Sequence, residues 1–88
     1  MKEVMISKLS VLNPKVIDLV DISEKHRGHL GYNSNGSHFS LLIVSNKFFN
    51  IPKIQRHRMI HKILEEEMKT QLHALELKLI TEEEHELE

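Results

Sequence analysis

The chain has 88 residues, so it fits one domain with a modest hydrophobic core. Its formal charge of −1 argues against a dedicated nucleic-acid or membrane-surface binder. The lack of cysteine excludes disulfides, thiolate nucleophiles and any zinc or iron–sulfur site built on its own thiols. Neither a signal-peptide pattern nor a membrane-length apolar run occurs, so we expect a single domain over residues 1–88 in a soluble, cytoplasmic protein.

The first half of the chain predicts a helix, two strands and a long loop. Apolar side chains at i, i+4 and i+7 within residues 5–12 predict a short helix, which Pro14 ends. Residues 15–22 are β-branched and apolar, as in a strand. Residues 23–36 are polar and hold all three glycines, which indicates a loop of functional length. Residues 38–44 predict a second strand, apolar on both faces towards its end and therefore central.

The second half predicts a long helix, a strand and a helical tail. Residues 53–70 carry apolar side chains on one helical face, preceded by a Phe48-Phe49 pair that we expect in the core. Residues 72–79 alternate as in a strand. Residues 80–88 form a C-terminal helix or tail, in which Thr81 and the three glutamates after it are the signature of a helix start. A right-handed crossover makes the second and third strands parallel. We therefore expect an α+β sandwich of αββαβ(α) order, a three-stranded mixed sheet with helices on one face.

Histidine accounts for seven residues and provides the first candidate site. The strand alternation places His73 on the core-facing side, at a rim position that still reaches solvent. His26 and His29 lie in the glycine-bearing loop, and movement of this loop could bring either of them to His73. Imidazoles without any thiol suggest nitrogen ligands for a metal whose sulfur comes from another molecule. The alternative is a half-buried structural His73 with solvated loop histidines.

A basic stretch of the long helix is the second candidate site. Lys53, Arg56, Arg58 and Lys62 could bind phosphates or the acidic side chains of a partner. The alternative is a solvated basic turn. The Gly-x-x-Gly at residues 28–31 matches KH-type RNA binders only weakly, because here it is predicted to join two strands rather than two helices.

Six segments form a recognisable set: Ser37-His38-Phe39, Val44-Ser45, Phe48, Arg56-His57-Arg58-Met59-Ile60, Glu66 and His73-Ala74-Leu75. Taken together, they closely resemble the BolA family over nearly the whole chain. The resemblance implies an α-β-β-α-β fold related to class II KH domains. It also implies a non-enzymatic partner of monothiol glutaredoxins, in a heterodimer that shares a glutathione-bound [2Fe–2S] cluster.

The same resemblance implies the ligands. His73 matches the family's C-terminal ligand histidine, and His26 best matches the second ligand, in the loop between the first two strands, with His29 as the alternative. His38 looks structural, so no ligand role is carried onto it. We expect no cofactor in the isolated protein and no membrane partner.

Two other hypotheses stay open. One is a DNA-binding transcriptional regulator that uses the KH-like scaffold and its basic helix. The other is a stress-linked interaction domain without metal. Either could be accompanied by a weak homodimer.

Overall fold

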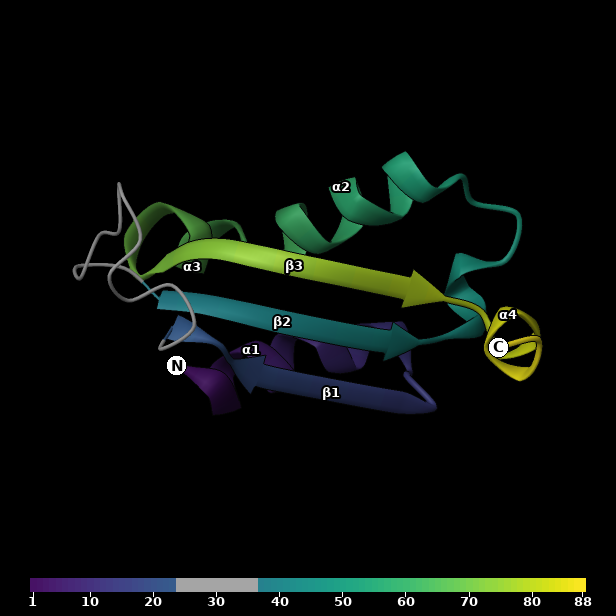
Figure 1. Cartoon of the computed structure of the whole chain (residues 1–88). Helices are drawn as coiled ribbons and strands as arrows, with labels where there is room; N and C mark the ends of the chain where they lie inside the picture. The colour runs from purple at the N-terminus through teal and green to yellow at the C-terminus, as the bar shows by residue number, and fades with distance from the viewer. Residues whose placement is uncertain (24–36) are drawn as a thin grey trace.

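The computed structural model describes residues 1–23 and 37–88, which form an α+β fold with one sheet (Figure 1). The predicted loop at residues 23–36 therefore lies almost wholly outside the described residues. No helix within the described residues is long and apolar enough to cross a membrane. The elements are α1 (Lys2–Leu9), η1 (Ser10–Leu12), β1 (Val16–Asp21), β2 (Ser37–Val44), η3 (Asn46–Phe48), α2 (Lys53–Ile63), α3 (Glu65–Thr70), β3 (Leu72–Ile80) and α4 (Glu82–Glu86).

The sheet has the order β1-β2-β3, which confirms β2 as the central strand. β1 runs antiparallel to β2, and β3 runs parallel to it, as the crossover through α2 and α3 predicts. Both β2 and β3 therefore begin at one end of the sheet and finish at the other, next to α4 (Figure 1). This topology fixes which functional residues can meet.

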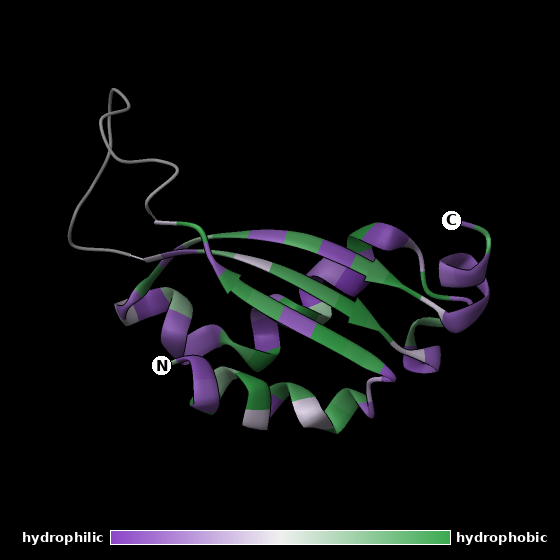
Figure 2. Ribbon diagram, turned by 60° about the horizontal axis from the view of Figure 1, so that its bottom comes forward, coloured by the Kyte–Doolittle hydropathy of each residue, from purple (hydrophilic) through white to green (hydrophobic). Residues whose placement is uncertain are grey.

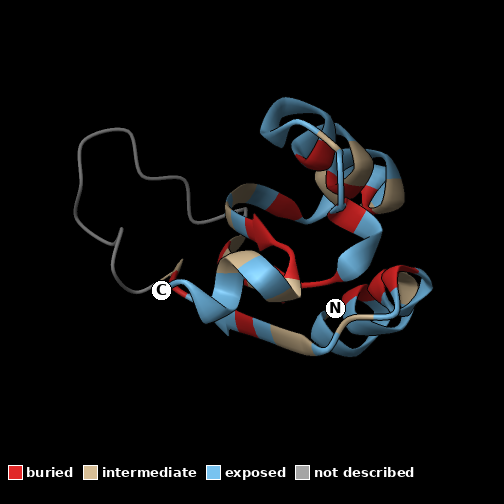
Figure 3. Cartoon of the chain, turned by 90° about the vertical axis from the view of Figure 1, so that its right-hand side faces the viewer, coloured by how far each residue is buried: buried red, intermediate tan, exposed pale blue. Residues whose placement is uncertain are grey.

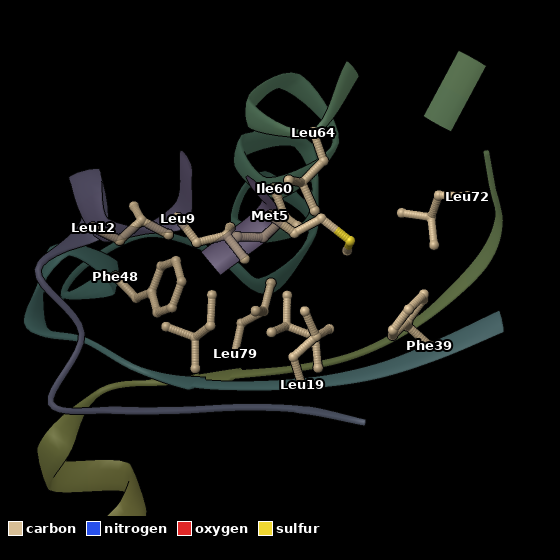
Figure 4. Packing of buried hydrophobic residues seen from close by; sticks show 12 residues of the cluster. Met5, Leu9, Leu12, Leu19, Phe39, Phe48, Ile60, Leu64, Leu72 and Leu79 are labelled. Carbon is tan, nitrogen blue, oxygen red and sulfur yellow. The ribbon is translucent and has the colours of Figure 1, made fainter. Parts of the chain in front are cut away.

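The core lies between the sheet and the helices α1 and α2 (Figure 4). Alternate residues of β2, Phe39, Leu41 and Ile43, are buried because their side chains share the helix-covered face. Figure 3 shows that the buried positions gather where the helices meet the sheet. The C-terminal helix α4, by contrast, is hydrophilic along its length and lies outside this core (Figure 2). Other members of the core cluster are Met5, Leu9, Leu12, Leu19, Phe48, Ile60, Leu64, Leu72 and Leu79.

The Phe48-Phe49 pair is only half in the core. Phe48 is fully buried, whereas Phe49 is 63% exposed. The expectation for Phe49 is therefore wrong, because the short helix η3 ends between the two residues and sends their side chains in different directions.

The long helix predicted over residues 53–70 is divided at Leu64, whose backbone leaves helical geometry at φ −101° and ψ 24°. Leu64 is fully buried, so the bend places its side chain in the core. Because of the bend, Glu65, Glu66 and Glu67 occupy the first turn of a new helix, α3, where the helix dipole favours acidic side chains. No proline or glycine marks this position, which is why periodicity alone could not locate it.

The C-terminal helix begins as predicted. The Thr81 side chain accepts a hydrogen bond from the Glu84 backbone N–H, and the Glu84 carboxylate accepts one from the Thr81 N–H, which completes a capping box.

Candidate functional site: the histidine pair and the basic helix

His73 stands at the start of β3, and its side chain is exposed. The preceding Leu72 is almost fully buried and belongs to the core. A rigid strand with a buried neighbour thus carries an imidazole that solvent and a partner can reach. This is the exposure that a ligand to a metal held mainly by another molecule requires.

The face assigned to His73 from simple alternation is wrong. The register pairs Ser37 with Leu72 and His38 with Ala74, so His73 is an extra residue at a β-bulge. A bulge shifts the phase of the alternation by one residue. Leu72 and Leu75 therefore both reach the core, and His73 between them does not share their face.

The described histidine that contacts His73 is His38, on the neighbouring strand. Their ring centroids are 5.1 Å apart and the planes are inclined by 42°. The next residue, Phe39, points into the core, so His38 points to the opposite face of the sheet. The pair therefore lies on the face away from the core helices.

The described residues on either side of the 24–36 segment lie at the same end of the sheet as this pair. The Ile22 N–H donates to the His38 carbonyl oxygen at 2.8 Å, and the Ser37 N–H donates to the Gln71 carbonyl oxygen at 3.0 Å. The candidate ligands His26 and His29 lie outside the described residues.

The residues at this end fit the nitrogen half of an iron–sulfur site. An exposed imidazole can replace a thiolate on one iron of a [2Fe–2S] cluster. Within the described residues no group of three or more His, Asp or Glu side chains could hold a metal ion. Among the described residues at this end, His73 could supply one nitrogen ligand, and any thiolate ligand would have to come from another molecule because the chain has no cysteine.

The basic candidate residues lie in two different environments. Arg56 is only 6% exposed. Its guanidinium donates from Nε to the Ile51 carbonyl oxygen at 2.8 Å and from Nη1 to the Leu79 carbonyl oxygen at 2.9 Å and the Glu84 carboxylate at 2.7 Å. It also lies 5.6 Å from the centre of the Phe48 ring. The acid that Arg56 binds is thus in its own chain, which corrects its assignment as a phosphate or partner contact.

The other three candidates, Lys53, Arg58 and Lys62, are exposed on α2. The spacing of Arg58 and Lys62 places them one helical turn apart. His57 and His61 are exposed on the same helix, and α2 contains no acidic residue. The outer surface of α2 is therefore basic, although the chain as a whole is nearly neutral.

The Glu84 carboxylate completes the Arg56 network. The hydrogen bond from Arg56, followed by that from the Thr81 backbone, lowers the pKa of Glu84 from 4.5 to about 2. Glu84 does not stand out in the sequence, because residues 82–84 form an acidic run of the kind found on solvated helix faces. The one available signal was its position three residues after Thr81, which marks the capping box.

Known proteins resemble this chain in sequence and in fold. The family model described as BolA-like protein matches residues 9–84. The DNA-binding transcriptional regulator BolA of Haemophilus influenzae is 45% identical over 62 residues, covering 68% of this chain and 60% of the relative. BolA-like protein 1 of Bos taurus is 36% identical over 70 residues, covering 80% of this chain and 50% of the relative. The match thus spans less than two thirds of either relative.

A solved structure supports the same assignment. The BolA domain of SufE1 from Arabidopsis thaliana superposes with a TM-score of 0.81 at 35% identity, covering 93% of this chain and 92% of that domain. The order of the strands, the matched sequence and the shared fold lead to one conclusion. The chain belongs to the BolA-like protein family.

Proposed function

We propose that this protein is a non-enzymatic adaptor in iron–sulfur trafficking that binds a monothiol glutaredoxin and supplies histidine nitrogen to a shared, glutathione-bound [2Fe–2S] cluster. The observation that carries the proposal is the exposed His73 on a rigid strand start in a chain without cysteine. Family resemblance supplies the identity of the partner. A SufE-like protein of Arabidopsis thaliana that is 35% identical over 71 residues is a further member of the same group of relatives.

In this proposal the protein's own residues bind and orient rather than catalyse. The buried Leu72 before His73 and Ala74 after it are both paired with β2, which fixes the backbone on either side of His73, so its imidazole is presented with little loss of conformational freedom on binding. His26, or His29 in its place, contributes the second nitrogen. The cluster, when bound, would supply the redox and transfer chemistry.

The test is spectroscopic. The full chain is mixed with a monothiol glutaredoxin, glutathione, iron and sulfide, and the visible absorption and circular dichroism are compared with those of His73→Ala. We expect the spectrum of the mixture to change in His73→Ala and to stay unchanged in the control His85→Ala, an exposed histidine on α4. Identical spectra for His73→Ala and the wild type would remove His73 from the cluster. Single His26→Ala and His29→Ala variants then identify the second ligand.

A second candidate function is DNA binding through α2. It is favoured by the exposed Lys53, Arg58 and Lys62 on a helix that contains no acid, and the Haemophilus influenzae relative is named a DNA-binding transcriptional regulator. Cationic side chains on a helix surface can neutralise phosphates without any base contact. In this function Arg56 would hold the helix in place rather than contact DNA.

A further inference from the structure

The His73 imidazole has one contact in the described structure that can orient it. Pairing on either side of the bulge fixes its backbone, but an exposed side chain can still rotate about χ1 and χ2. Within residues 1–23 and 37–88 this side chain makes no hydrogen bond or ion pair, and its ring contact is with His38. The orientation of the His73 ring therefore depends on His38.

His38 is held more firmly than His73. It lies on the central strand β2, which is paired with a strand on each side. Its N–H donates to the Ser23 hydroxyl at 3.1 Å, and its carbonyl oxygen accepts from the Ile22 N–H at 2.8 Å. The residue itself is half-buried, and the next residue, Phe39, is in the core. A fixed ring thus lies against an exposed one.

The contact between the two imidazoles has the geometry of ordinary ring packing. Their centroids are 5.1 Å apart and their planes are inclined by 42°. Packed rings have centroids roughly 4.5–7 Å apart. Such a contact favours the His73 rotamer in which the rings touch over rotamers in which its ring turns into solvent.

Ring packing takes the part that a hydrogen bond usually plays at a ligand histidine. A histidine that binds a metal is generally oriented by its second ring nitrogen, which donates to a carboxylate, a carbonyl oxygen or water. No described side chain or carbonyl group accepts such a bond from His73. Packing against His38 orients the ring without occupying either of its nitrogens.

We propose that His38 is a positioning residue for His73, whose imidazole it holds in one rotamer before a partner arrives. His38 itself supplies no ligand. The inference rests on the proposed function for the use made of His73. It extends that function by assigning a role to a second histidine on a different strand.

The expected effect of losing this support has an upper bound. A histidine has three staggered χ1 wells and about two for its ring torsion, so a freed imidazole spreads over at most about six orientations. Apparent affinity falls in proportion to the fraction of molecules in the competent orientation. His38→Ala should therefore weaken the cluster-bound complex by roughly twofold to sixfold. His73→Ala removes the nitrogen itself and should weaken the complex more.

The first arm of the test uses the isolated full chain. Three-bond NMR couplings between the Hα and Hβ protons of His73 report its χ1 rotamer. We expect the couplings of one rotamer in the wild type and averaged couplings in His38→Ala. His38→Phe, which keeps a ring at this position, should restore the single rotamer. The control Ser40→Ala, two residues further along the same face of β2, should leave the couplings unchanged.

Two outcomes of this arm would overturn the inference. The first is averaged couplings in the wild type, which requires no variant and so does not depend on whether a variant folds. The second is a single His73 rotamer in a His38→Ala protein whose cooperative thermal unfolding shows that it is folded.

The second arm measures the affinity of each variant for a monothiol glutaredoxin carrying the glutathione-bound cluster, by titration followed in visible circular dichroism. A loss of twofold to sixfold in His38→Ala, with recovery in His38→Phe, supports the inference. Wild-type affinity in a His38→Ala protein with averaged His73 couplings overturns it. An unchanged spectrum in His73→Ala counts against the proposed function instead, and the couplings of the isolated protein still decide whether His38 orients the ring.

Discussion

The Arg56 guanidinium donates to the Glu84 carboxylate at 2.7 Å and thereby ties the first turn of α2 to α4. The same side chain reaches the carbonyl oxygen of Leu79 near the end of β3. Three elements from different parts of the sequence thus meet at one buried cation. Because a buried cation without its acceptors is costly, this contact should be important to the stability of the fold.

Replacing Arg56 should destabilise the protein strongly. Arg56→Ala is expected to lower the free energy of unfolding by about 3 kcal/mol, because it leaves the carbonyl oxygens of Ile51 and Leu79 without their donor. The measurement is urea unfolding followed by circular dichroism. The control Arg58→Ala, exposed on the same helix, should change this free energy by less than about 0.5 kcal/mol. Equal losses in the two variants would contradict the structural role of Arg56.

Glu84 should make stability depend on pH in the acid range. Its pKa is about 2 in the folded protein against an ordinary value of 4.5, so the folded state favours the ionised form. The stabilisation is therefore complete above pH 4.5 and is lost as the pH falls towards about 2. Thermal unfolding midpoints measured across this window should fall less steeply in Glu84→Gln than in the wild type. The control Glu83→Gln, an exposed neighbour on α4, should keep the wild-type slope; a wild-type slope in Glu84→Gln would exclude this origin.

The adjacent residues Phe48 and Phe49 should differ sharply in their contribution to stability. Phe48→Ala removes a fully buried ring and is expected to cost about 3–4 kcal/mol of unfolding free energy. Phe49→Ala changes a side chain that is 63% exposed and should cost less than about 1 kcal/mol. Urea unfolding of both variants checks the difference. A small loss for Phe48→Ala would mean that η3 does not anchor the core as described.

Nucleic-acid binding, where it occurs, should depend on the outer surface of α2. Arg58→Ala/Lys62→Ala is expected to reduce the steepness of the salt dependence of DNA affinity by roughly 2 in log–log slope, because each lost phosphate contact contributes about 0.9. The measurement is fluorescence anisotropy with duplex DNA at several salt concentrations. The control Lys47→Ala/Lys69→Ala removes the same charge from η3 and α3, away from that surface. If both double variants lose the same slope, binding reflects net charge rather than a site on α2.

The parts of the fold that the sequence predicted well are those set by local pattern. The apolar residues on both faces of residues 41–44 identified the central strand, and the predicted crossover fixed its parallel pairing with β3. The Thr81 signature identified the start of α4. Each of these depends on neighbouring residues or on a general rule of chain topology, so a single sequence was sufficient.

The features that were predicted wrongly from the sequence depend on contacts between residues that are distant in the chain. The bulge at His73 is visible only in the pairing with β2, so alternation along one strand gave it the wrong face. Arg56 and Glu84 are 28 positions apart, and nothing in either local sequence shows that the two side chains meet. The residue type and the family resemblance were enough to identify His73 as a candidate ligand. Its contact with His38 could be seen only in the folded sheet, because the two residues lie on different strands.

The parallel arrangement of β2 and β3 sets the histidine pair and the Arg56 network far apart. His73 is the second residue of β3, whereas Arg56 binds the backbone of Leu79 near the end of that strand, roughly 20 Å away at about 3.3 Å per residue. Substitutions at two such separate places should have additive energetic effects. A molecule seated over one end would leave the other uncovered, so the histidine end of the sheet and the anchor of the C-terminal helix can change independently of each other.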